Sequence, residues 1–171
     1  MSSAELIAPW HDFFILIGTA AATLIGAMFV VVSIGIGILS RDRSIAIRVF
    51  LSTTVVHLST VFFGCVLAMV PVLTPRSQAI IAGVAGVAGI GYSLHVIWGF
   101  SQHRGTVLSD WFWYAAFPLV AYAVLVMAAG LGLDDTAEGL DLFAAVLTVL
   151  LVAGMRNAWD MLVYLVTRER T

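Results

Sequence analysis

The stretch DFFILIGTAAATLIGAMFVVVSIGIGIL, which runs from Asp12 to Leu39, decides the fold class of this chain. Beyond Asp12 it holds no charged residue, and it is longer than the about 20 apolar residues that a helix needs to cross a bilayer. Further runs of the same kind follow along the sequence. The expected membrane spans are residues 12–39, 46–73, 78–100, 111–133 and 140–167.

The composition agrees with membrane insertion. Of the 171 residues, 61% are hydrophobic and 11% are charged, whereas soluble domains contain about 45–50% apolar and about 25% charged residues. The connections between the expected spans are too short to hold a soluble domain. The sequence therefore predicts an all-α integral membrane protein, a single transmembrane domain over residues 1–171 built as one bundle of five helices.

The charged residues exclude several classes of function. A net charge of -2 provides no basic surface for phosphates, so nucleic acid is not an expected partner. All eight basic residues are arginines, and without a lysine no Schiff-base chemistry is available. Cys65 is the single cysteine, which rules out an internal disulfide and a multi-cysteine metal site.

The distribution of arginines predicts the orientation, because cytoplasmic loops are enriched in positive charge. Arg76 lies alone on one side of the expected bundle. The residues on the other side are Arg41, Arg43, Arg48, Arg104, Arg168 and Arg170. We therefore expect the N-terminus outside and the C-terminus in the cytoplasm. The expected localisation is multi-pass in the lipid bilayer of a bacterial cytoplasmic membrane.

Small residues predict where helices approach one another closely in lipid. In the first span Gly18, Ala22 and Gly26 recur at four-residue spacing, and residues 82–91 of the third span hold seven glycines and alanines. This density predicts that the third helix is the central one. Pro118 lies inside the fourth span, where we expect it to kink the helix and free a carbonyl.

The first span also carries a small or polar residue at every seventh position, so one helix face is polar across the membrane. These residues are Asp12, Thr19, Gly26, Ser33 and Ser40. Such a face either packs against another helix or lines water, and both interpretations remain open at this point.

Polar residues of four spans are expected at one depth. His57 lies nine residues beyond Arg48, and His95 nine residues before Arg104, which places both roughly 14 Å from the cytoplasmic edge. The same estimate puts other polar groups at roughly 12–18 Å. The expected polar layer consists of Ser33, His57, His95, Arg156, Asn157 and Asp160. Within it, Thr53, His57 and Thr60 share one helix face, and Arg156 and Asp160 are one turn apart and suited to an ion pair.

An ionisable side chain inside a span costs about 2.5–3.5 kcal/mol on insertion scales and suggests a function. The first hypothesis is a homo-oligomeric channel or transporter for ions, protons or a small solute, with the layer as filter, gate or proton relay and no cofactor. A second is a membrane subunit in which His57 and His95 ligate a haem, or in which these histidines and Asp160 bind a divalent metal. A third is a non-catalytic scaffold or accessory subunit.

Residues at the outer mouth form a second candidate site. Either Asp12 caps the first helix, or His11 and Asp12 together attract cations or protons. No catalytic residue is predicted, because the sequence lacks zinc-protease, phosphate-loop and dinucleotide motifs. The run Gly91-Tyr92-Ser93-Leu94-His95 begins like a nucleophile elbow but lacks the final glycine. An enzyme is therefore not the expected class.

Overall fold

The five-helix prediction is confirmed. A computed structural model describes residues 8–35, 44–101, 112–134 and 137–168, and within them five helices are long and apolar enough to cross a membrane. The elements are η1 (Ala8–Trp10), α2 (His11–Gly35), α3 (Ser44–Met69), α4 (Pro75–Ser101), η3 (Phe112–Ala116), α6 (Phe117–Gly132) and α7 (Ala137–Arg168).

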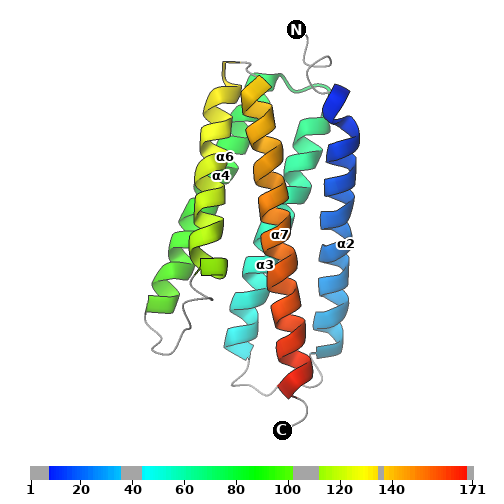
Figure 1. Cartoon of the computed structure of the whole chain (residues 1–171), viewed down its shortest axis with the longest axis vertical. Helices are drawn as coiled ribbons and strands as arrows, with labels where there is room; N and C mark the ends of the chain where they lie inside the picture. The colour runs from blue at the N-terminus through cyan, green and yellow to red at the C-terminus, as the bar shows by residue number, and fades with distance from the viewer. Residues whose placement is uncertain (1–7, 36–43, 102–111, 135–136, 169–171) are drawn as a thin grey trace.

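The long helices run alternately up and down the bundle, so α2 begins at one end and α7 finishes at the other (Figure 1). The central helix is α7, which packs against both α3 and α6. The outer positions belong to α2, which packs on α3, and to α4, which packs on α6. The prediction that the third span, α4, is the central helix is therefore wrong. Its small residues pack against one partner helix, α6, while valines on its other faces are exposed.

Local hydrogen bonds explain where α3 ends and α4 begins. The chain turns after Met69, four residues before the predicted end of the second span, and Pro71 lies in this turn. The Thr74 hydroxyl accepts a 3.2 Å bond from the Ser77 backbone N–H and caps α4, with Pro75 at its first position. The third helix thus begins three residues earlier than predicted. The predicted end of the first span, Leu39, lies outside the described residues.

The fourth span begins with a π-helical turn. Residues Phe112–Ala116 form this turn, and α6 follows with Pro118 at its second position. The proline lacks an N–H, and its ring would collide with the carbonyl four residues earlier in a regular helix. The wider π turn accommodates both effects, so the irregularity expected at Pro118 lies just before the proline.

Glycines let α4 approach α6 closely. A Cβ built on Gly86 would lie 2.7 Å from Val126 Cγ2, and one built on Gly89 would overlap the ring of Tyr122. The prediction that small residues of the third span mark a contact face is confirmed here. On the same helix, a Cβ on Gly91 would meet nothing within 4 Å.

The small residues of α2 behave differently from the prediction. Gly18 does contact α3, with its added Cβ 3.1 Å from that of Cys65, but Gly26 meets nothing within 4 Å. The buried face of α2 passes instead through Phe14, Ala21 and Met28. The small and polar face that contains Gly26 therefore points away from the bundle.

We expect Gly89→Ala to destabilise the protein by about 1–3 kcal/mol, because the added methyl would displace the Tyr122 ring. Gly91→Ala is the matched control, and we expect it to be neutral or stabilising by up to about 1 kcal/mol, since alanine favours the helix. Thermal unfolding in detergent measures both. Equal unfolding temperatures for the two variants would contradict the packing described here.

Candidate functional site

A buried polar cluster lies where α3, α4, α6 and α7 meet. As predicted, Thr53, His57 and Thr60 share one face of α3, and Thr53 and His57 are each 1% exposed. The Thr53 hydroxyl lies 3.2 Å from the hydroxyl of Tyr92 on α4. His57 Nδ1 lies 2.9 Å from the hydroxyl of Tyr122 on α6. The cluster therefore links α3 to both helices on this side of the bundle.

The hydrogen bonds around Tyr122 assign the proton on His57. The Thr60 hydroxyl donates to the backbone carbonyl of Val56 at 2.9 Å, which uses its one hydrogen. At the 3.2 Å contact between Thr60 and Tyr122, the tyrosine hydroxyl must then donate. Tyr122 is left as the acceptor from His57, so Nδ1 carries the hydrogen and Nε2 has a free lone pair.

This lone pair is buried without a partner. His57 Nε2 has no hydrogen-bond partner among the described residues, although the side chain is only 1% exposed. A buried polar atom left unpaired costs about 1–3 kcal/mol. The Nε2 atom can thus accept a hydrogen bond from a donor group that the described residues do not supply.

Asn157 on α7 is a second unsatisfied residue. It is 0% exposed, and neither Nδ2 nor Oδ1 has a partner in the part of the chain that the structure describes. A Cβ built on Gly154, one turn away, would lie 2.7 Å from Leu58 Cδ2 and 3.9 Å from His57 Cβ. Asn157 therefore lies on the face of α7 that packs against α3, one turn from the level of His57.

The charged members of the expected layer lie elsewhere, in a cluster that we call the rim cluster. It consists of Arg156, Asp160, Trp113 and Tyr114. Arg156 Nε lies 3.8 Å from Asp160 Oδ2, and its guanidinium lies 4.5 Å from the centre of the Trp113 ring. Tyr114 donates a 3.4 Å bond to Asp160. The side chains of Arg156 and Asp160 are 42% and 36% exposed, so this ion pair lies at the surface of the bundle, and Asp160 is the last residue of the candidate span Ala137–Asp160.

We expect the double variant Arg156→Leu, Asp160→Leu to change the free energy of unfolding by less than about 1 kcal/mol, because part-exposed ion pairs contribute little. Asp160→Leu alone leaves the guanidinium without its carboxylate and should lower the stability more. Thermal unfolding in detergent compares the two variants. Loss of folding in the double variant would contradict this assignment.

The structure does not bring the remaining predicted site residues into the buried cluster. Ser33 is exposed and donates to its own helix, at the carbonyl of Phe29. His95 is exposed on α4, with its ring 6.3 Å from that of Trp98. At the other end of the bundle, His11 Nδ1 lies 3.2 Å from Asp12 Oδ1, and both side chains are exposed.

Two histidines that the sequence places at one depth, His57 and His95, therefore lie in different surroundings. His57 is buried and bonded to Tyr122, whereas His95 is exposed on the surface of α4. Among the described residues, no three histidine, cysteine, aspartate or glutamate side chains are grouped to hold a metal ion. His57, His95 and Asp160 are included in that part of the chain and do not converge.

Sequence reasoning missed Tyr122, the residue on which the cluster depends. No other polar residue of α6 lies one helical turn from Tyr122, so the sequence shows no polar helix face that would indicate a site there. In the sequence, Tyr92 stands out only as part of the run that begins like a nucleophile elbow. The signal available was that a tyrosine at membrane depth needs a partner for its hydroxyl.

These observations define a class, namely an all-helical chain with five helices long and apolar enough to span a membrane. Comparison with models of protein families, with curated proteins and with solved structures finds no match. The buried polar cluster is therefore the feature of the molecule that points to a function.

Proposed function

We propose that this chain is a small membrane transport protein that carries protons, with His57 Nε2 as the proton-binding atom. One observation carries the proposal, the buried Nε2 lone pair with no partner among the described residues. Imidazole is the side chain that exchanges protons near neutral pH. Ionisable groups inside membrane helices typically mark ion or proton pathways.

The neighbours of His57 suit this role. Tyr122 accepts from Nδ1 and holds the ring in one orientation, while Asn157 offers both an acceptor oxygen and donor hydrogens on the adjoining helix. Water bound between these groups would satisfy them and supply a path for protons. No metal or redox group takes part in this proposal.

The proposed orientation follows the count of arginines, with the N-terminus outside and the C-terminus in the cytoplasm of a bacterial cell. Arg76, at the start of α4, lies at the end of the bundle opposite to the last turn of α7. Arg41, Arg43, Arg104 and Arg170, on which the count also depends, lie outside the described residues.

The test is proton flux into liposomes that contain the purified protein and a pH-sensitive dye, with a potassium ionophore to balance charge. We expect flux above that of empty liposomes, and we expect His57→Gln to lower it to that background. Glutamine can still bond to Tyr122 but cannot bind a proton at neutral pH.

His95→Gln is the control, because this histidine is exposed and outside the cluster. It should retain the flux of the unaltered chain. Background flux in the unaltered protein, or undiminished flux in His57→Gln, would refute the proposal. Equal losses in both variants would favour the single polar layer over the cluster.

We also propose that the chain forms a homo-oligomer through α2. Its polar face is exposed, and Thr23 and Ser33 donate to backbone carbonyls of their own helix at 2.8 Å. A face of this kind with Gly26 at its centre suits close approach of a second helix.

We expect Gly26→Leu to reduce the molecular mass in detergent, measured by light scattering, from an oligomer to one chain. Ala27→Leu places the same leucine side chain on the adjacent exposed face and should leave the mass unchanged. A single-chain mass for the unaltered protein would show that α2 does not mediate assembly.

A further inference from the structure

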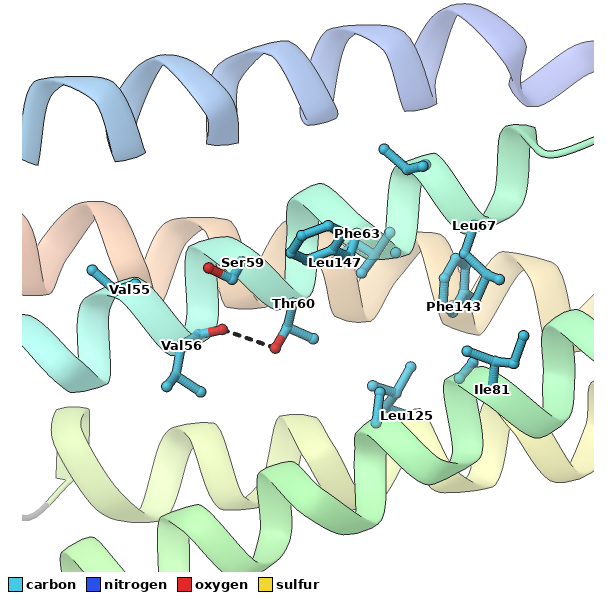
Figure 2. Close-up of a pocket in the computed structure, with 14 residues that line it drawn as sticks. Val55, Val56, Ser59, Thr60, Phe63, Leu67, Ile81, Leu125, Phe143 and Leu147 are labelled. Atoms are coloured by element: carbon cyan, nitrogen blue, oxygen red, sulfur yellow. Dashed lines mark hydrogen bonds between the residues drawn. The ribbon is translucent and has the colours of Figure 1, made fainter. Parts of the chain in front are cut away.

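A groove separates α3 from α4 on one side of the bundle (Figure 2). Its walls come from α3 between Val55 and Leu67 and from α4 between Ile81 and Ala85, while Leu125 of α6 and residues of α7 line its base. The groove has a volume of about 560 Å³. This volume lies in the range of about 300–1,000 Å³ that is typical of small-molecule sites.

The position of the groove places it in the hydrocarbon. Its α3 wall covers twelve residue steps, or about 18 Å along the helix axis, within the candidate span Ser52–Met69. Phe63 and Ile81 are 65% and 46% exposed, so the groove is open on the side that faces the bilayer. Its ligand would therefore enter from the lipid phase.

The lining is apolar except for two hydroxyls. Of the 14 lining residues, Ser59 and Thr60 are polar and none carries a charge. A charged ligand would lose its hydration here without a counter-charge, which is costly in a medium of low dielectric constant. Thr60 lies near the middle of the span, far from the headgroup region where phospholipids keep their polar groups. The lining thus selects an uncharged molecule that dissolves in the bilayer core.

The hydrogen bonds of Thr60 specify the polar group of that molecule. Its hydrogen is used by the Val56 carbonyl, and one lone pair accepts from Tyr122. A threonine hydroxyl accepts two hydrogen bonds, so one lone pair remains for a donor. The complementary ligand carries a hydrogen-bond donor, such as an O–H group.

We propose that this groove binds a compact, lipid-soluble alcohol such as a terpene alcohol, whose hydroxyl donates to Thr60. Its apolar body lies against Phe63, Ile81 and Leu125. Because Thr60 is bonded to Tyr122 and Tyr122 to His57, the occupied groove contacts the buried cluster through two hydrogen bonds. This proposal does not depend on proton transport, because it is tested by ligand binding alone.

The experiment uses a terpene alcohol with a photoreactive diazirine and the purified chain in lipid nanodiscs. After irradiation, mass spectrometry locates the labelled residues. We expect labels on the groove residues of α3 and α4, and we expect unlabelled alcohol to compete about five-fold better than the hydrocarbon without the hydroxyl, the effect of one hydrogen bond of about 1 kcal/mol.

Two pairs of variants distinguish the contribution of the groove's shape to binding from that of the hydrogen bond to Thr60. Ala85→Phe fills the groove and should reduce its labelling at least five-fold, whereas Ala88→Phe adds the same ring to the exposed surface of α4 outside the groove and should not. Thr60→Val should remove the preference for the alcohol, and Thr60→Ser should retain it. Labelling spread evenly over all exposed helix faces, or equal competition by the hydrocarbon, would overturn the proposal.

Discussion

The hydroxyl of Tyr122 is the point on which the interior of this bundle depends. In a bilayer the lipid tails offer no hydrogen bonds, so the polar groups of helices depend on partners inside the protein. This hydroxyl accepts from His57 and donates to Thr60, and its ring fits against the bare backbone of Gly89. One side chain of α6 thus holds α3 by hydrogen bonds and α4 by shape.

Close contacts at two glycines set the geometry around this residue. Gly89 brings α4 against α6, and Gly154 brings α7 against Leu58, next to His57. The imidazole is consequently surrounded by packed helices, and its side chain is only 1% exposed. The burial of His57 thus results from close packing of the helix backbones.

The sequence predicted the helices well and the site only in part. Long apolar runs determine the number of spans, and threonines at helical spacing around His57 indicated its shared face. Depth follows from the rise per residue, but the rotation of each helix follows from side-chain packing between helices. For this reason His57 and His95, expected at one depth, occupy a buried and an exposed environment. The same limitation concealed Tyr122, whose importance depends on what α3 and α4 present to it.

The pairing of the helices differs from their order along the chain. The turn after Met69 joins α3 directly to α4, yet these two helices hardly touch, and α4 packs on α6. Because α6 follows α4 along the chain, α4 is synthesised before the helix against which its small-residue face packs. The Ser93 hydroxyl on that face donates to the carbonyl of Gly89 within its own helix, so this bond does not depend on α6. The packing of α4 can therefore be completed only after the ribosome has passed α6, and that of α3 against α7 only after the last helix has been made.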